Sequence, residues 1–458
     1  MGSFKQEVAN ATHIAADPPN LPEIYFDGSS YFHPDKTGYK HFGREDTVLH
    51  LRYIGFLHRT AHNVELSPCE FALHRLQTEH RVDFAGPFCG RPPGFWKEGT
   101  TTILCTQGPT IIEPKQGDAS PINFLLTSLF GKGRDPHFNT QLLTFYGWLQ
   151  HARNALRAHQ QHMPGQALAL VGPQDCGKSL LQSVITLAIG GRETDPSLSL
   201  VKGNDFNSDL WKAEHLRLGD EELVEDGRGG TRLLRERIKK LVTADLYPLH
   251  GKYKDAKSFR PIWRLTLSSN DDSESISVLP PPTDSFFDKI IYLQCYAPAA
   301  PYHDGSEEAR KAFWQRLVDA LPAFLYELEN LELPKSCRAS RFFVKEFHHP
   351  RVVELITTTS PVSSLGELFI SLIKKNDGEP IEGTAAEIYS KLWSSEGLLL
   401  KGYSRSAAHL GHQLARLQKL PGWENQITRT ERRIPPSRWH QTIWKISALT
   451  NPETNRST

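Results

Sequence analysis

The sequence predicts an α/β protein with a phosphate-binding core, preceded by a small α+β domain and a helical collar and followed by a winged helix. Three observations support this fold class. A glycine-rich loop motif stands between an apolar run of strand length and a helical stretch. Apolar runs alternate with helical stretches through the middle of the chain, as in an α/β sheet. The last part reads as three helices and a β-hairpin, the order of a winged helix-turn-helix.

Composition and charge limit the classes of protein to which this chain can belong. The 458 residues suggest about two to four domains. Hydrophobic residues make up 38% and charged residues 23%, which is typical of a folded globular protein and excludes a disordered chain. The net charge is only +1, so nucleic-acid binding has to come from local basic clusters. No apolar run reaches the ~18–20 residues that span a bilayer, and the six scattered cysteines lack zinc spacing, which fits a reducing cytosol.

Breaks in composition and periodicity predict the domain boundaries. The predicted parts, in order, are a disordered tail (1–20), an accessory α+β domain (21–114), a helical collar or linker (115–160), the core (161–300), a helical extension and linker (301–355), the winged helix (356–447) and a tail (448–458). In the accessory domain, short aromatic and β-branched runs broken by turns indicate antiparallel sheet with few helices. Apolar spacing over 306–332 indicates amphipathic helices.

Residues 172–179 match the phosphate-loop pattern G-x-x-x-x-G-K-[ST] without a departure. They follow the apolar run ALALV and precede the helical LLQSVITLA, the context that this motif requires. In such a loop, backbone N–H groups surround a β-phosphate at a helix start, the lysine reaches the β and γ oxygens, and the serine ligates Mg²⁺. The sequence therefore predicts a nucleotide and Mg²⁺ as ligands. The predicted nucleotide-binding residues are Gly172, Pro173, Gln174, Asp175, Cys176, Gly177, Lys178, Ser179 and Leu180.

Hydrolysis needs carboxylates downstream of the loop, and the segment HLRLGDEELVED supplies them. The apolar residues before them predict a short strand that places Asp220 and Glu221 at its carboxyl end, beside the phosphate loop. Asp220 would hold Mg²⁺ together with Ser179, and Glu221 would orient the attacking water, with Glu222 as the rival for that second role. The apolar run WRLTLSSND ends in Asn270, whose amide can bond the water or the γ-phosphate.

Taken together, these motifs resemble those of superfamily 3 helicases, which are AAA+ ATPases of small viruses, phages and plasmids. The helicase portions of phage and plasmid primase-helicases are the most similar. The stretch IKKLVTADLYPLHGKYKDAKSFRPIWRLTLSSND looks like the family's β-hairpin, which bears a lysine-aromatic pair ahead of the Asn strand. Here that pair is Lys252-Tyr253. The segments GNDFNSDLWKAEHLRLGDEE and SLFGKGRDPHFNTQLLTFYGWLQ are similar to the family's flanking sequences, so the resemblance covers residues 115–296.

The resemblance implies an AAA+ type P-loop ATPase that assembles as a hexameric ring. ATP would lie between neighbouring subunits, and the hairpins would line the channel and move a single DNA strand. It also implies single-stranded and forked DNA as partners, a separate primase or polymerase, and a cytoplasmic location in a prokaryotic cell or a phage-infected host. The residues agree independently, because Lys252, Lys254 and Lys257, with His250 and Tyr253 among them, combine charge for a backbone with an aromatic face for a base. A solvated lysine-rich hairpin is the plainer alternative.

Two features depart from the family's pattern. Related enzymes carry an arginine after the Asn strand that reaches the neighbour's γ-phosphate, whereas PTDSFFDKIIYLQC offers only Lys289. Arg264 is a further candidate for this trans finger, and the remaining alternatives are Arg232, Arg235, Arg237 and Arg260. The space before residue 115 is short and shows no paired-aspartate metal motif, so no primer synthesis is expected.

The last domain carries a local excess of basic residues between 401 and 445, which suits DNA phosphates. The segment SRSAAHLGHQLARLQ would be the recognition helix, with Ser404, Arg405 and His409 near its entry end. Three leucines, at 410, 414 and 417, would pack inward. TRTERRIPPSR would be the wing and would bring Arg432 and Arg433 to DNA. The alternative is a winged helix that binds protein or serves as a structural cap.

Three functions therefore compete. The first is a ring-shaped, ATP-driven DNA helicase that replicates a phage, a plasmid or another mobile element. The second is a replication initiator or DNA-loading ATPase with little unwinding activity. The third is a small-molecule kinase, which is disfavoured because the sequence shows no acceptor-binding lid and the lysine-aromatic hairpin would have no role.

Overall fold

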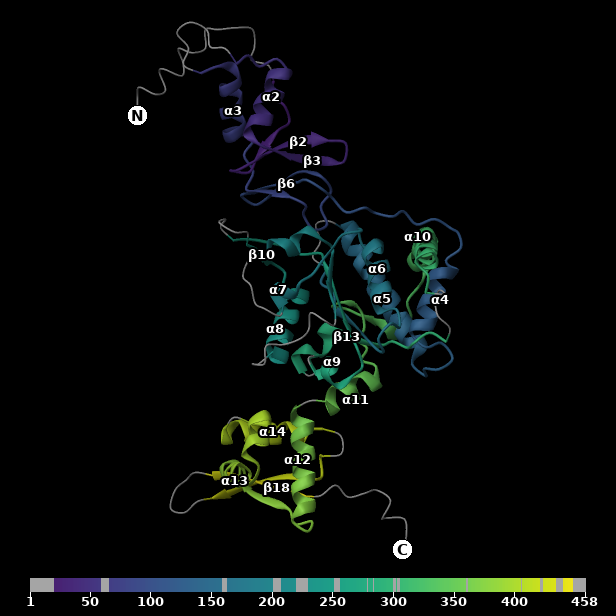
Figure 1. The fold of residues 1–458 in the computed structure, drawn as a ribbon, viewed down its shortest axis with the longest axis vertical. Helices are drawn as coiled ribbons and strands as arrows, with labels where there is room; N and C mark the ends of the chain where they lie inside the picture. The colour runs from purple at the N-terminus through teal and green to yellow at the C-terminus, as the bar shows by residue number, and fades with distance from the viewer. Residues whose placement is uncertain are drawn as a thin grey trace, which may run out of the picture.

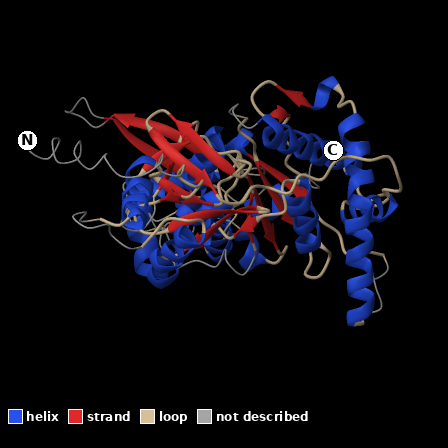
Figure 2. Ribbon diagram, turned by 90° about the horizontal axis from the view of Figure 1, so that it is seen from above, coloured by secondary structure: helices blue, strands red, loops and turns tan. Residues whose placement is uncertain are grey.

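Three parts of the chain follow one another along the long axis of the molecule (Figure 1). The computed structural model describes residues 20–58, 66–158, 163–200, 207–219, 230–250, 256–277, 279–282, 284–299, 302, 305–359, 361–404, 406–420, 423–433 and 440–447. Viewed down that axis, helices flank the strands (Figure 2). Within the described residues, no helix is both long enough and apolar enough to cross a membrane.

The N-terminal part is a small α+β unit with two three-stranded sheets. Its elements are β1 (Tyr25–Phe26), β2 (Tyr31–Asp35), β3 (Gly38–Phe42), α2 (Arg44–Tyr53), α3 (Pro68–Glu79), β4 (Phe84–Gly86), β5 (Gly94–Glu98) and β6 (Thr101–Cys105). The expected antiparallel pairing holds for β1-β2-β3 and for β5-β6, but β4 pairs parallel with β6. Helix α3 begins with a capping box, in which Ser67 and Glu70 bond each other's backbone N–H groups, and with Pro68 in its first turn.

The core holds a five-stranded, all-parallel sheet in the order β13-β7-β12-β9-β8. Its strands are β7 (Ala167–Val171), β8 (Glu193–Thr194), β9 (His215–Leu218), β12 (Arg264–Ser269) and β13 (Ile290–Gln294). All residues of the three strands β7, β12 and β13 are buried, because helices cover both faces of a parallel sheet. The helices of this part are α6 (Lys178–Ala188), α7 (Ser197–Leu200), α8 (Gly230–Thr243) and α9 (Ser273–Ser277), with one-turn segments at Ser208–Lys212 and Asp284–Lys289.

One face of this sheet packs against helices from before and after it in the chain. These helices are α4 (Ser120–Leu129), α5 (Phe138–Ala158) and α10 (Glu307–Asn330), which share a hydrophobic core with α6. The sequence indicates several helices over 306–332, whereas the structure has one helix that continues through Pro322. Buried side chains on both sides of the proline, such as Leu317 and Phe324, provide packing that outweighs the lost backbone hydrogen bond.

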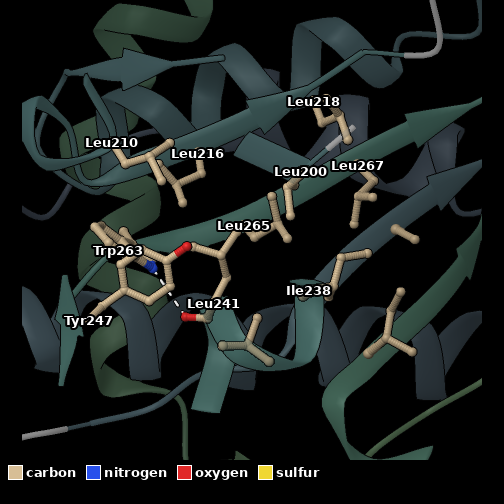
Figure 3. Close-up of a cluster of buried hydrophobic side chains, with 14 of the residues drawn as sticks. Leu200, Leu210, Leu216, Leu218, Ile238, Leu241, Tyr247, Trp263, Leu265 and Leu267 are labelled. Atoms are coloured by element: carbon tan, nitrogen blue, oxygen red, sulfur yellow. Dashed lines mark hydrogen bonds between the residues drawn. The ribbon is translucent and has the colours of Figure 1, made fainter. Parts of the chain in front are cut away.

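The other face of the sheet packs against an aromatic and aliphatic cluster (Figure 3). Trp263 is buried there, and its indole N–H donates to the carbonyl of Leu241 at 3.2 Å. Tyr247 and Trp211 both contact the Trp263 ring, with centroids 5.3 and 4.8 Å away. This cluster lies beneath the antiparallel pair β10 (Tyr247–Leu249) and β11 (Lys257–Phe259), which flanks the predicted hairpin residues.

The N-terminal part is attached to the core through this same cluster. Phe88 is buried and stacks on Trp211, with ring centroids 5.1 Å apart. The backbone N–H of Gly90 donates to the Glu214 carboxylate at 2.8 Å, and Arg192 pairs with the same carboxylate. Gly90 has φ +70°, and a Cβ there would meet the Ile262 side chain. The attachment is therefore specific and tightly packed.

We expect Phe88→Ala to lower the free energy of unfolding by about 3–5 kcal/mol, because it leaves a cavity between the two parts. Phe95→Ala is the matched control, since Phe95 is 46% exposed. Urea unfolding followed by tryptophan fluorescence measures both variants. Equal shifts for the two variants would show that the Phe88 contact does not hold the parts together.

The chain leaves the core through a hairpin and a short helix, β14 (Arg338–Ala339), β15 (Phe343–Val344) and α11 (Pro350–Thr358). Val352 and Ile356 of α11 are buried in the cluster that covers the sheet. The predicted boundary between residues 355 and 356 therefore falls inside a helix that belongs to the core. It was misplaced because the apolar face of α11 is filled by tertiary contacts, which have no local signature.

The C-terminal part is a separate α+β unit with its own hydrophobic core. It contains α12 (Pro361–Lys375), β16 (Ile381–Thr384), α13 (Ala385–Tyr403), α14 (Ala407–Leu417), β17 (Ile427–Arg433) and β18 (His440–Ile446). The three helices and the hairpin β17-β18 agree with the predicted order. Strand β16, which pairs with β18, was not predicted, because the four residues IEGT are too short to show alternation.

Candidate functional site

The predicted phosphate loop connects the buried strand β7 to the start of α6. Gly172 packs so closely on the end of β13 that a Cβ would lie 2.3 Å from the Cys295 carbonyl oxygen. Gly177 has φ +108°, a conformation open to glycine but strained for other residues, and it immediately precedes α6. Both glycines are therefore required by the local structure, Gly172 by its close contact with Cys295 and Gly177 by its positive φ angle. The loop leads directly into the start of α6.

Lys178 is the best-connected side chain of the loop. It is only 6% exposed, and its Nζ donates to the carbonyls of Gly172 and Pro173, both at 2.7 Å. A third bond of 3.0 Å reaches the side-chain oxygen of Asn270. The ammonium group thus lies over its own loop, where a bound phosphate would offer it stronger, charged acceptors.

Asn270 reaches the loop because of the strand order. It directly follows β12, which pairs parallel with β7 so that Ser269 lies opposite Val171. The two strands end at the same edge of the sheet, where open α/β sheets bind ligands. The structure thereby brings together two of the predicted catalytic residues, Lys178 and Asn270, from positions far apart in the sequence.

The predicted acidic residues Asp220, Glu221 and Glu222 lie outside the described residues. Strand β9 ends at Leu218, as the sequence indicates, and runs parallel to β12 on its far side from β7. The carboxylates therefore follow a strand that ends at the same edge of the sheet, one strand further from the loop than Asn270.

A buried polar network beneath the loop was missed in the sequence. The His215 ring bonds the Thr186 hydroxyl at 2.7 Å through Nδ1 and the Thr266 hydroxyl at 2.8 Å through Nε2. Gln182 donates to the same Thr266 hydroxyl at 2.8 Å. Burial lowers the pKa of His215 to about 3, so the ring is neutral and links α6, β9 and β12. Such a network has no sequence signal, because its members lie within otherwise apolar elements.

Arg217 is a second residue that the sequence did not single out. It projects from β9, and its guanidinium donates to the Ser179 carbonyl at 3.2 Å and to the Ser183 hydroxyl at 3.1 Å. It also pairs with Glu193 at 3.2 Å. A positive charge therefore lies at the first turn of α6, beside the exposed Ser179. Its only signal in the sequence is one charged residue inside the apolar run HLRL.

The first two trans-finger candidates, Arg264 and Lys289, are buried within their own chain. Arg264 is 2% exposed and donates to the carbonyls of Trp263 at 3.0 Å and Met163 at 2.9 Å. Lys289 is 5% exposed, pairs with Asp288 and lies over the Phe342 ring. Neither side chain can reach a neighbouring subunit from these positions, so this expectation is corrected. The physical reason is that both cations contact groups of their own chain: the two terminal nitrogens of Arg264 donate to backbone carbonyls, and Lys289 pairs with Asp288.

The alternative finger residues differ in their surroundings. Arg260 is 54% exposed in its side chain and pairs with Asp245 at 3.4 Å. Arg237 donates to the Leu200 carbonyl at 2.8 Å, and Arg235 lies 3.8 Å from Glu236. The side chain of Arg232 lies outside the described residues. Arg260 is thus the most exposed of the described alternatives.

The predicted lysine-aromatic hairpin has a well-anchored base. The residues Lys252, Tyr253 and Lys254 themselves lie outside the described residues. Asn207 holds the strand before them, accepting from the His250 N–H at 2.8 Å and donating to the Pro248 carbonyl at 2.9 Å. The buried Tyr247 and Phe259 lie opposite each other at the base. The segment 251–255 is therefore presented by a fixed pair of strands.

In the C-terminal part, the predicted inward leucines of α14 are buried, which confirms that pattern (residues 410, 414 and 417). Ser404 is also fully buried, with its hydroxyl donating to the Ser406 carbonyl at 3.0 Å, so it is a structural residue and not a DNA contact. The exposed face of α14 instead carries His412, Arg416 and, just beyond the helix, Lys419. Arg432 is exposed on β17. Arg405 and the side chain of Arg433 lie outside the described residues.

Comparisons with known proteins give a match to a family model over part of the chain and a likeness of fold to solved structures. A family model described as a family of unknown function (DUF5906) matches residues 170–284. The apo structure of the NrS-1 C terminal region is 14% identical, covers 95% of this chain and 100% of its own, and gives a TM-score of 0.53. Among curated proteins, no sequence matches.

Two structures titled as helicases align less well. A JCV helicase is 16% identical over 56% of this chain and 70% of its own, with a TM-score of 0.28. The SCCmec type IV Cch helicase is 10% identical over 84% and 67%, with a TM-score of 0.27. This chain therefore shares the fold of the NrS-1 C terminal region over nearly its whole length, as a mixed α/β protein with a parallel sheet.

Proposed function

We propose that this chain is an ATP-driven DNA helicase of the superfamily 3, AAA+ type, which moves on single-stranded DNA as a hexameric ring. It would serve the replication of a phage, plasmid or other mobile element. The observation that carries the proposal is the bond between Lys178 and Asn270 across two neighbouring parallel strands. That contact joins the cation for the phosphates to an amide at the position where the γ-phosphate would lie.

In this proposal, the loop residues 172–180 hold the nucleotide, and Mg²⁺ is bound by Ser179 and Asp220. The site fits the ion and the phosphates, because the loop leads directly into the start of α6 and Ser179 is exposed there. The ion would neutralise charge on the β and γ oxygens. Lys178 would exchange its carbonyl partners for phosphate oxygens, and Asn270 would then be released to bond the γ-phosphate or the attacking water.

The proposed role of Glu221 is to orient the attacking water. We expect Glu221→Gln to bind ATP like the wild type and to lose turnover, because the amide cannot accept the proton of the water. Binding of a fluorescent ATP analogue and phosphate release measure the two effects separately. Glu222→Gln is the matched control, and turnover that falls in this control alone would give the role to Glu222.

DNA would be engaged at two places in this proposal. The hairpin residues 252–254 would contact a single strand in the channel, and the C-terminal part would bind duplex as a winged helix. What supports the second role is the exposed basic face of α14 with Arg416 and Lys419, together with Arg432 on the hairpin β17-β18. Positive groups on one helix face and one hairpin match phosphates on both sides of a groove.

A truncation after Thr359 tests the role of the C-terminal part, because it removes that unit and leaves α11 in the core. We expect ATP hydrolysis to remain while duplex affinity falls and its salt dependence weakens, since several phosphate contacts are lost. Fluorescence anisotropy at several salt concentrations measures this. Unchanged affinity and salt slope would make the domain a protein-binding or structural cap.

The alternative is an initiator or DNA-loading ATPase whose nucleotide cycle controls assembly and which unwinds little. Phosphate release measured with and without single-stranded DNA first tests whether DNA stimulates ATP hydrolysis, as both the helicase and the loading ATPase require. Stimulation by DNA supports them, whereas ATP consumption only with a small-molecule acceptor would indicate a kinase. Unwinding then separates the helicase from the loading ATPase.

A further inference from the structure

A tyrosine from the segment between β13 and α10 contacts the phosphate loop. The hydroxyl of Tyr302 donates to the Cys176 carbonyl at 3.2 Å. Its ring lies so close to the next residue that a Cβ added at Gly177 would be 3.2 Å from the ring and 3.4 Å from the hydroxyl oxygen. Burial raises the pKa of the Tyr302 phenol, so the group keeps its proton and stays a donor near neutral pH. The tyrosine therefore bonds the loop at the peptide unit between Cys176 and Gly177.

Two helices hold the ring of Tyr302 through contacts that do not involve its hydroxyl. The ring stacks on Phe313 of α10, with centroids 5.5 Å apart and planes 17° apart. Phe124 of α4 meets it edge-on, at a centroid distance of 6.1 Å. Phe313 is itself buried, and the guanidinium of Arg316 lies over its ring at 5.3 Å. Because α4 and α10 share a hydrophobic core with α6, packing fixes the ring and presents the hydroxyl to the loop.

The bonded peptide unit is one whose direction local sterics do not set. Gly177, which follows it, has φ +108°, and glycine puts little steric limit on its own φ. Asp175, two residues earlier, has φ +57°, a conformation that costs energy for a residue with a side chain. In a trans peptide, the carbonyl and the following N–H point in opposite directions. Since the Cys176 carbonyl is turned towards Tyr302, the Gly177 N–H points away from the tyrosine.

We propose that Tyr302 is a positioning residue for the nucleotide, which holds the Gly177 N–H in the direction of the β-phosphate. This role rests on the proposed nucleotide site, where backbone N–H groups of the loop surround that phosphate. Without the hydroxyl, the peptide unit between Cys176 and Gly177 is free to rotate, and the loop loses a fixed donor. The β-phosphate is held alike before and during hydrolysis, so the loss affects binding and KM and leaves kcat unchanged.

The test is Tyr302→Phe in the full chain, which removes the hydroxyl and keeps a ring between Phe124 and Phe313. We expect the affinities for ADP and ATP to fall together, by about 3–10-fold, whereas AMP, which has no β-phosphate, binds as it does to the wild type. Competition against a fluorescent ADP analogue measures all three. The KM for ATP should rise by the same factor. Tyr326→Phe is the matched control, because its hydroxyl belongs to an exposed residue of α10 and should not matter.

Two results would overturn the positioning role. One is an equal loss of affinity for AMP, ADP and ATP, which would mean that the hydroxyl only supports the fold around the loop. The other is a fall in kcat with KM unchanged, which would place its effect in the chemical step. Thermal unfolding shows whether Tyr302→Phe is as stable as the wild type. Should AMP bind too weakly to compete, the comparison of KM with kcat decides alone.

Hydrogen exchange in the nucleotide-free protein separates this proposal from the proposed function. We expect the amides of the loop peptide 171–180 to exchange faster in Tyr302→Phe than in the wild type, because the loop opens more often without its bond to the tyrosine. If the wild type binds no nucleotide, the proposed function fails, and the exchange still shows whether Tyr302 fixes the loop. Unchanged exchange together with unchanged affinity for ADP would contradict any positioning by Tyr302.

Discussion

Lys178→Ala should abolish ATP hydrolysis, with a loss of about 10²–10³-fold or more in turnover. The ammonium group is the cation that lies over the loop, bonded to the carbonyls of Gly172 and Pro173 and to Asn270. No other lysine among the described residues contacts these carbonyls. Without it, the charge that develops on the β and γ oxygens loses its fixed partner inside a buried site. Phosphate release by the purified protein measures the loss.

Lys212→Ala is the matched control for this variant. Lys212 is half exposed and pairs with Asp209 on the surface, so its removal should leave hydrolysis and folding close to wild type. Circular dichroism and thermal unfolding show whether Lys178→Ala still folds. A folded Lys178→Ala protein with wild-type turnover would mean that the loop is not the catalytic nucleotide site.

Lys252→Ala should leave basal ATP hydrolysis near wild type and abolish both its stimulation by DNA and unwinding. The reason is that β10 and β11, which flank residues 251–255 in the sequence, pack on the aromatic cluster around Trp263, whereas Lys178 belongs to the phosphate loop. Loss of one phosphate contact weakens DNA binding and shallows the salt slope by about one unit. Hydrolysis with and without single-stranded DNA, at several salt concentrations, measures this.

Tyr253→Ala gives a second, different signature. It should remove a base-stacking contact of about 1–3 kcal/mol and leave the salt slope unchanged. Lys212→Ala is again the control, because Lys212 is half exposed and lies outside the hairpin. If Lys252→Ala instead eliminates basal hydrolysis while DNA binding persists, the lysine acts at a neighbour's nucleotide site and the channel role fails.

The parts of the site that could be predicted are those that are local in the sequence. The phosphate loop is continuous, so its glycines and Lys178 stand out by spacing alone, and the apolar runs before Asn270 and Asp220 predict strands that the structure has as β12 and β9. The three-helix and hairpin order of the C-terminal part likewise follows from periodicity. The order of the strands in the sheet was not predictable from the sequence. This order places β12 beside β7 and so brings Asn270 to the phosphate loop.

Other features depend on which groups meet in space. Arg264 suggested a finger because the segment after the Asn strand offers no arginine, yet backbone carbonyls, among them that of Met163 from another segment, accept hydrogen bonds from it inside the fold. Nothing near Arg264 in the sequence announces those acceptors. The same holds for the attachment of Phe88 to Trp211, since it joins residues separated by more than a hundred positions. Long-range packing of this kind leaves no periodic trace.

The measurement that tests the central proposal most directly is strand separation of a forked DNA duplex by the full-length protein with ATP and Mg²⁺. The proposal predicts that the wild type separates the strands, that a non-hydrolysable ATP analogue stops the reaction, and that Lys178→Ala and Lys252→Ala do not separate them. DNA-stimulated hydrolysis without strand separation would contradict the helicase and favour the DNA-loading ATPase. Hydrolysis that DNA does not affect at all would contradict both.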